Sequence, residues 1–210
     1  MISIFDKHYK RYDAWYDNHK HAYLSEIEAV KKVLPAKGRG LEIGVGTGRF
    51  ASVLGIAQGV EPSEHMAALA RQRGVIVDIA TGEDLPFDDE TFNYVAIFIS
   101  LCFFSDPIKV LTEARRVAKK NGKLIIGIVD RESFLGKEYQ EKESVFYKVA
   151  HLFSVDEVVA MVNELHFNVL SYWQTLFSLP EEITSVQEPI EGFGQGGFVV
   201  INCQKQIDEK

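Results

Sequence analysis

The sequence has 210 residues, of which 46% are hydrophobic and 25% charged, a composition that suits one soluble globular domain with a single core. Its formal net charge of -7 argues against a surface that binds nucleic acid or anionic lipid through massed basic side chains. The two cysteines, Cys102 and Cys203, lie far apart, so the sequence offers neither a redox pair nor a zinc cluster. No apolar run resembles a signal peptide or is long enough to span a bilayer, so we expect a cytoplasmic protein without a membrane span.

Helical and extended patterns alternate along the chain, which is typical of a parallel sheet flanked by helices. Two helices are expected within residues 2–34, ended by Pro35 and the glycine turn that follows. Apolar runs then predict seven strands, at residues 40–45, 56–60, 75–79, 94–99, 123–129, 168–176 and 197–203. Further helices are expected at about residues 48–54, 64–73 and 106–119, and after a capping box of Ser154 and Glu157. The pattern predicts a single doubly wound α/β domain that takes up residues 1–210.

The first predicted strand leads into GLEIGVGTGRF, residues 40–50, with glycines at positions 44, 46 and 48. In doubly wound sheets this first turn from strand to helix usually contacts the ligand. Glycines there let a ligand lie against peptide N–H groups, although they could also serve only a tight turn. A dinucleotide fingerprint would place its third glycine at position 49, where this chain has Arg49, so the spacing argues against a nicotinamide cofactor.

The pattern E-x-G-x-G-x-G from Glu42 to Gly48 resembles the first motif of class I S-adenosylmethionine-dependent methyltransferases. It is most similar to the methyltransferase type 11 group, which includes ubiquinone-biosynthesis-like and other small-molecule methyltransferases. The resemblance runs from about residue 12 to the last strand. It implies a Rossmann-like, seven-stranded sheet in the order 3-2-1-4-5-7-6 with the last strand antiparallel. It also implies S-adenosyl-L-methionine as the cofactor, with residues 1–34 as a helical lid and residues 35–210 as the core.

Two later motifs extend the resemblance. GVEPSEHM ends the second strand with Glu61, where the family places an acidic residue that accepts hydrogen bonds from both ribose hydroxyls; the alternative is a charge at a helix N-terminus. ATGEDLPFDDETFNYV resembles the third motif, but Thr81 stands where the family commonly has Asp, and Gly82 replaces Ala. The resemblance implies the following cofactor-binding residues: Glu42, Gly44, Val45, Gly46, Gly48, Glu61, Pro62, Met66, Glu83, Asp84 and Ser100.

The fourth strand ends in IFISLCFFSD, where the family brings the acceptor to the methyl group. Methyltransferases that act on base amines carry an Asp or Asn, two prolines and an aromatic residue here, and their absence argues against a base acceptor. Cys102 is interpreted as a buried apolar residue, because methyl transfer from a sulfonium needs no nucleophilic thiol. Tyr12 and Tyr16, at helical spacing near the N-terminus, could be core residues or could stack on a small amine or aromatic acceptor. With Leu101 they are the predicted substrate residues.

The predicted reaction is direct in-line displacement, in which the protein positions the partners and excludes water. A general base is needed only if the acceptor must lose a proton, and no catalytic residue is identified. His8, His19, His21 and His151 have no partner visible in the sequence. The expected partner is a small-molecule acceptor, with no metal. The alternatives are an NAD-dependent oxidoreductase and a regulatory protein that binds S-adenosylmethionine without turnover, and the oligomeric state stays open.

Overall fold

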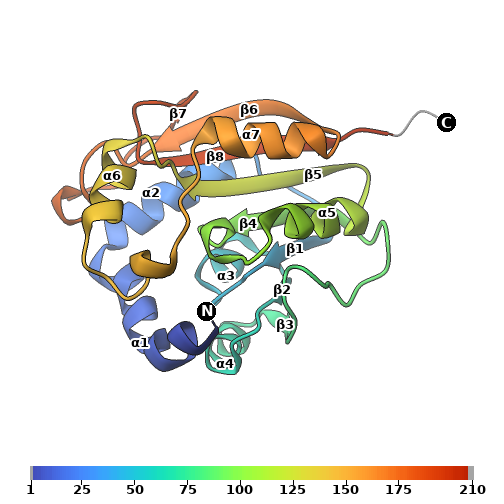
Figure 1. Cartoon of the computed structure of the whole chain (residues 1–210), viewed down its shortest axis with the longest axis horizontal. Helices are drawn as coiled ribbons and strands as arrows, with labels where there is room; N and C mark the ends of the chain where they lie inside the picture. The colour runs from blue at the N-terminus through green and yellow to red at the C-terminus, as the bar shows by residue number, and fades with distance from the viewer. Residues whose placement is uncertain (1, 208–210) are drawn as a thin grey trace.

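A central sheet organises the molecule (Figure 1), and the computed structural model describes residues 2–207 of the chain. Within these residues the sheet has eight strands in the order β3-β2-β1-β4-β5-β8-β6-β7. Their bounds are β1 Gly40–Ile43, β2 Gln58–Val60, β3 Ile76–Asp78, β4 Phe92–Phe98, β5 Ala118–Val129, β6 Phe167–Thr175, β7 Ile190–Glu191 and β8 Phe198–Lys205. The first five strands pair in parallel, and β8 lies antiparallel between β5 and β6. The predicted order is therefore confirmed, with β7 as an addition at the edge.

Two parts of the sheet differ from the prediction. The strand β7 pairs with β6 only through Trp173 and Gln174, and two paired residues are too few to leave an alternating pattern in the sequence. The strand β5 begins at Ala118, where Phe92 is its partner in β4, and an irregularity follows before the register continues at Lys123. The predicted helix before it consequently ends at Val117 and not at residue 119.

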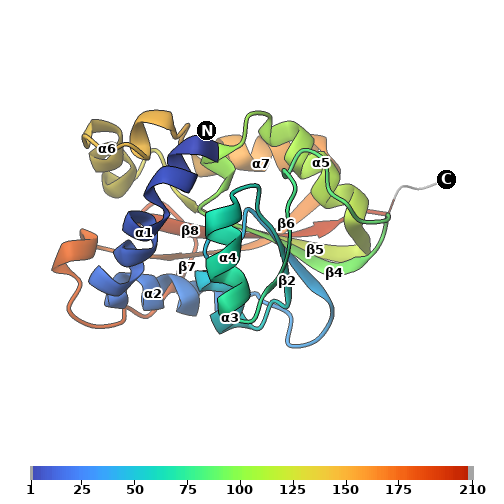
Figure 2. The ribbon, with the colours of Figure 1, turned by 90° about the horizontal axis from the view of Figure 1, so that it is seen from below.

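Helices cover both faces of the sheet (Figure 2). Among the described residues they are α1 Ile2–Asn18, α2 Lys20–Lys31, α3 Arg49–Leu54, α4 Glu64–Gln72, α5 Pro107–Val117, α6 Phe134–Glu141 and α7 Val155–Glu164. Residues of α5 and α7 pack in one buried cluster, whereas residues of α2, α3 and α4 pack in the other. None of the helices in residues 2–207 is long and apolar enough to cross a membrane.

Local signals explain where most helices begin. Asp106 caps α5, since its Oδ1 accepts the Lys109 N–H at 3.0 Å, and Pro107 occupies the first turn. Ser154 and Glu157 form the predicted capping box of α7. The sequence analysis missed α6, although Ser133 caps it in the same way by accepting the Gly136 N–H at 3.0 Å. This missed helix and the segment that follows it line a pocket together with α1, which contains a kink at His8.

Candidate cofactor and acceptor site

The glycine loop lies at the carboxyl end of β1, and Gly46 and Gly48 have different structural roles in it. Gly48 has a φ of 80°, and a Cβ there would lie 2.9 Å from the Ala70 Cα in α4, so this glycine allows α4 to pack against the loop. Gly46 has a φ of 55°, but a Cβ there would face only the ends of the Met66 and Tyr12 side chains, at 3.3 and 3.9 Å. Gly48 is therefore needed for packing, whereas Gly46 is buried beneath the ends of movable side chains.

Two buried carboxylates flank this loop. Glu61, at the end of β2, is 7% exposed; its Oε2 accepts the Gly46 N–H at 3.0 Å and its Oε1 accepts the Ser63 N–H at 2.9 Å. Burial raises the pKa of Glu61 to about 7. Glu42, in β1, is 2% exposed, and its Oε2 has no hydrogen-bond partner among the described residues. Burial also raises the pKa of Glu42 well above its ordinary value.

These carboxylates fit S-adenosylmethionine. Each oxygen of Glu61 keeps a second lone pair beyond its backbone hydrogen bond, so the carboxylate can accept two further donors such as ribose hydroxyls. Glu42 has an unpartnered oxygen beside the glycine loop, which suits a positively charged group such as the ammonium of the methionine part. The chain therefore has the hydrogen-bond acceptors that the ribose hydroxyls and the ammonium group of the cofactor need.

The remaining predicted cofactor residues follow neighbouring strands at the same sheet edge. Ser100, after β4, donates its hydroxyl to the Ile43 carbonyl oxygen at 3.0 Å and so ties the end of β4 to β1. Glu83 uses its Oε1 to accept the Ser105 N–H at 3.1 Å, next to the start of α5, and Asp84 is exposed. Pro62 is half-buried and Met66 is buried at the start of α4. Their contacts with a cofactor stay predictions.

Arg49, which occupies the position of the missing dinucleotide glycine, holds α1 against the loop. Its Nε and Nη2 donate to the two carboxylate oxygens of Asp13 at 2.9 and 2.7 Å, and Asp17 accepts from the same guanidinium at 2.7 and 2.8 Å. Arg73 adds a bond to Asp13 at 2.8 Å. The sequence showed that Arg49 excludes a dinucleotide loop, but it contained no signal for these partners.

Because α1 is held in this way, Tyr12 and Tyr16 lie over the glycine loop. The pocket between them and the loop measures only about 10 Å³, and Glu42, Gly44, Gly46 and Phe98 also line it. This space is about enough for one water molecule and far too small for a cofactor. A cofactor that occupied it would have to displace the Tyr12 and Tyr16 side chains that line it.

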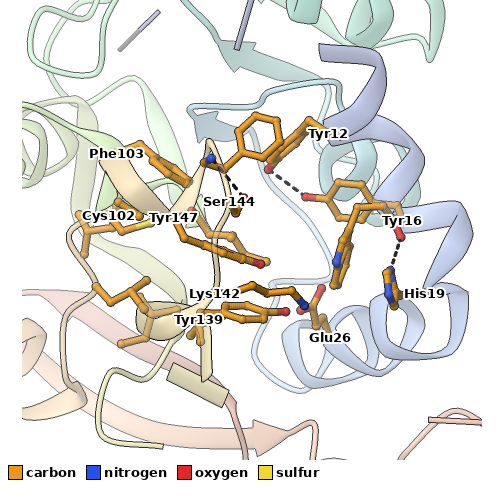
Figure 3. Close-up of a pocket in the computed structure, with 18 of the residues that line it drawn as sticks. Tyr12, Tyr16, His19, Glu26, Cys102, Phe103, Tyr139, Lys142, Ser144 and Tyr147 are labelled. Atoms are coloured by element: carbon orange, nitrogen blue, oxygen red, sulfur yellow. Dashed lines mark hydrogen bonds between the residues drawn. The ribbon is translucent and has the colours of Figure 1, made fainter. Parts of the chain in front are cut away.

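A second and much larger pocket, of about 300 Å³, adjoins the first one and shares Tyr12 and Tyr16 with it (Figure 3). It lies between α1, α2, the ends of β4 and β5, and the segment that follows α6. Aromatic side chains dominate its wall: Tyr12, Trp15, Tyr16, Phe103, Tyr139, Phe146, Tyr147 and Phe153. Leu101 also lines it, so the structure brings together the three predicted substrate residues.

The larger pocket is also lined by residues that could not be predicted from the sequence. Tyr139 lies on α6 and Tyr147 in the 3-10 turn η2 (Tyr147–Val149), and their rings stack with centroids 4.2 Å apart. Glu26 reaches the pocket from α2 and is 1% exposed. The cap at Ser133 was the available signal for α6; nothing in the sequence showed that α2 and η2 face one pocket.

Burial favours the uncharged forms of the Tyr12, Tyr16 and Cys102 side chains in this pocket. The phenol groups of Tyr12 and Tyr16 are hydrogen-bonded to each other at 3.0 Å, and burial raises the pKa of both. Burial of the thiol raises the pKa of Cys102 to about 12, which keeps it protonated and agrees with a residue that is no nucleophile. The residue is nevertheless only half-buried and lines the pocket, so the prediction that it is a buried packing residue is wrong in that respect. Of the four histidines considered above, only His19 lines this pocket; its Nδ1 lies 3.0 Å from the Trp15 carbonyl oxygen. Residues 2–207 contain no cluster of His, Cys, Asp and Glu that could hold a metal.

Comparison with known proteins agrees with this geometry. A methyltransferase domain model of type 11 matches residues 41–126. A crystal structure from Thermotoga maritima is 49% identical, covers 98% of this chain and 100% of its own, and superimposes with a TM-score of 0.95. That protein is described as an S-adenosylmethionine-dependent methyltransferase and possible histamine N-methyltransferase. The chain belongs to the S-adenosylmethionine-dependent methyltransferases.

Two further relatives show how far the likeness extends. An uncharacterised protein of Methanocaldococcus jannaschii is 50% identical to this methyltransferase over 97% of the chain and 100% of its own length. A demethylmenaquinone methyltransferase of Bacillus mycoides is 28% identical over 63% of the chain and 63% of its own length. The family assignment makes S-adenosyl-L-methionine the cofactor and sets aside the nicotinamide alternative.

Proposed function

We propose that this methyltransferase transfers the methyl group of S-adenosylmethionine to a small molecule bound in the acceptor pocket. The observation that carries this proposal is the arrangement of the two pockets, which share Tyr12 and Tyr16. A cofactor held at the glycine loop would therefore present its methyl group toward the larger pocket. A volume of about 300 Å³ suits a small molecule, at the lower end of the usual range for ligand pockets.

The residues of the chain would act by positioning and by excluding water. S-adenosylmethionine supplies a sulfonium methyl group, which an acceptor lone pair attacks in line with the departing thioether. Glu61 and Glu42 would hold the ribose and the ammonium group, while Leu101 and the aromatic wall keep water away from the reacting atoms. Residues 1–34 would act as the lid, since Arg49 and Arg73 hold α1 over the loop. A cytoplasmic location is part of the same proposal and could be tested by fractionation.

The first acceptors to test are small amines, because the Thermotoga maritima relative is described as a possible histamine N-methyltransferase. The assay incubates the full chain with methyl-labelled S-adenosylmethionine and either histamine or an extract of small metabolites. We expect labelled product to form together with S-adenosylhomocysteine. Binding of the cofactor without any transfer to the extract would instead favour the regulatory alternative.

The in-line step has its own test. With a methyl group made chiral by hydrogen isotopes, a single displacement inverts the configuration at carbon. We expect inversion in the isolated product. Retention would require two successive transfers, for instance through a methylated side chain, and would contradict the direct mechanism.

A further inference from the structure

A carboxylate stands on the wall of the acceptor pocket without a partner. Glu26 lies on the inner face of α2, and its side-chain carboxylate points into the pocket (Figure 3). The residue is 1% exposed, and its Oε2 accepts no hydrogen bond from the described residues. Burial raises the pKa of Glu26 well above its ordinary value. An unpartnered carboxylate in such a position is costly to keep, because its charge is removed from water.

The protein does not neutralise this carboxylate itself. None of the ion pairs within residues 2–207 includes Glu26, although Lys142 and Arg11 also line the pocket. Lys142 is exposed, and its ammonium lies 5.8 Å above the Tyr139 ring centroid. Most buried neighbours of Glu26 along α2 are apolar, and the two that carry a hydroxyl bond elsewhere: Ser25 donates to the His21 carbonyl oxygen and Tyr23 to the Arg49 carbonyl oxygen. Packing of α2 therefore gives no reason for an acidic residue at this position.

The other walls of the pocket suit a positively charged organic group. The stacked rings of Tyr139 and Tyr147 lie on the α6 side, and Trp15 stacks on His19 with centroids 4.8 Å apart on the α1 side. Aromatic faces attract a cation, and the attraction is larger where water is excluded. A carboxylate among such rings forms a site for a group that is both cationic and partly apolar.

We propose that the acceptor pocket selects organic ammonium compounds, and that Glu26 is the residue that pairs with their charged nitrogen. The inference rests on the proposed function, because it assumes that the larger pocket holds the acceptor. Glu26 is a binding and specificity residue in this account, and the aromatic side chains cover the hydrocarbon part of the ligand. The nitrogen that pairs with Glu26 is not the atom that takes the methyl group, because an ammonium has no lone pair. A neutral compound of the same shape would leave the buried carboxylate unpaired, and so would bind more weakly.

The test compares amines with alcohols of the same shape. Phenethylamine and 2-phenylethanol form one pair, and tryptamine and tryptophol form the other. Each is titrated calorimetrically into the full chain, alone and saturated with S-adenosylhomocysteine. We expect at least one amine to bind about tenfold tighter than its alcohol, a difference of about 1.4 kcal/mol. Equal affinities within both pairs, or no binding of either amine at millimolar concentration, would overturn the inference.

The variant Glu26→Gln keeps the size of the side chain and removes its charge. We expect the affinity for the amine to fall to that for the alcohol, while the affinity for the alcohol stays within about twofold. The matched control is Glu143→Gln, because Glu143 also lines the pocket but is exposed, so its charge is solvated and the amine preference should persist. An amine preference that survives in Glu26→Gln, or disappears equally in Glu143→Gln, would contradict the role of Glu26.

The outcome separates this inference from the proposed function. Glu26-dependent amine binding without any methyl transfer would leave the selectivity in place and remove the proposed reaction. Methyl transfer to neutral acceptors without an amine preference would support the proposed reaction and contradict the role of Glu26. If Glu26→Gln does not fold, the comparison of the two amine and alcohol pairs on the unaltered chain still decides the question.

Discussion

The cofactor half and the acceptor half of the site are built from different parts of the chain. Glu42, Glu61 and Ser100 lie in or directly after β1, β2 and β4, and hydrogen bonds to the backbone hold Glu61 and Ser100 in place. The acceptor half uses α1, α2, α6 and η2, which pack around the sheet, and its carboxylate, Glu26, has an oxygen with no partner. A sheet edge therefore fixes the cofactor half, whereas the acceptor half depends on how peripheral segments pack.

The largest effect is expected at Glu61. Replacing it by Ala removes charge-assisted hydrogen bonds worth roughly 1.5–3 kcal/mol, so cofactor affinity should fall by about ten- to a hundredfold. Calorimetry with S-adenosylhomocysteine measures this loss. Glu64→Ala is the control, because Glu64 is exposed in the first turn of α4. Equal losses in both variants would mean that Glu61 acts only through the helix N-terminus.

The pH dependence of cofactor binding should follow the same residue. Burial raises the pKa of Glu61 from an ordinary value of 4.5 to about 7 in the free protein. Ribose hydroxyls donate to the ionised form, so affinity should increase as the pH rises from 6 to 8. About one tenth of the carboxylate is ionised one unit below its pKa, which predicts an affinity loss of roughly tenfold at pH 6.

Glu61→Gln provides the control for this pH profile, and the part of the profile that is due to Glu61 should disappear in this variant.

The folding stability of the free protein should change with pH in the opposite direction. A carboxyl group whose pKa is raised on folding favours the folded state most at low pH, and this contribution is lost as the pH rises from about 4.5 to about 7. Denaturant unfolding of both proteins at several pH values would show whether the two profiles differ in this window.

A change in the acceptor half should leave the cofactor half unaffected. Tyr147→Ala removes one ring of the stacked pair with Tyr139, which is worth about 0.5–1.5 kcal/mol beyond its buried area. We expect the KM for the acceptor to rise by roughly two- to tenfold, with an unchanged Kd for S-adenosylhomocysteine. A similar loss of cofactor affinity would show that the two halves are coupled through this segment.

The smallest effect is expected at Arg49, which connects the two halves through α1. Arg49→Lys keeps the charge but loses the two parallel bonds to Asp13, and this should lower the free energy of unfolding by about 1 kcal/mol. Denaturant unfolding measures the change. Arg11→Lys, at an exposed position of α1, should change it by less than about 0.5 kcal/mol. If the two variants lost the same stability, the contact between Arg49 and Asp13 would have no special role.

The sequence by itself determined the fold and was enough to predict the residues of the cofactor half. Alternating strand and helix patterns predicted seven of the eight strands in the described residues, because buried strands leave continuous apolar runs, and the order of the strands came from the family resemblance. The glycine loop and Glu61 could be assigned because each directly follows a strand, and the sheet brings the carboxyl ends of its parallel strands to one edge. Helix N-caps such as Asp106 and Ser154 could also be predicted from the sequence, because their hydrogen-bond partners lie only three residues away.

Only the tertiary structure decided the acceptor half. Glu26, Tyr139 and Tyr147 are far apart in the sequence and share no spacing, so no local pattern indicates that they face one pocket. The same holds for Arg49, whose partners Asp13 and Asp17 lie 36 and 32 residues away. Such contacts form where helices pack on the sheet, and that packing depends on the shapes of whole faces and not on any short run of residues.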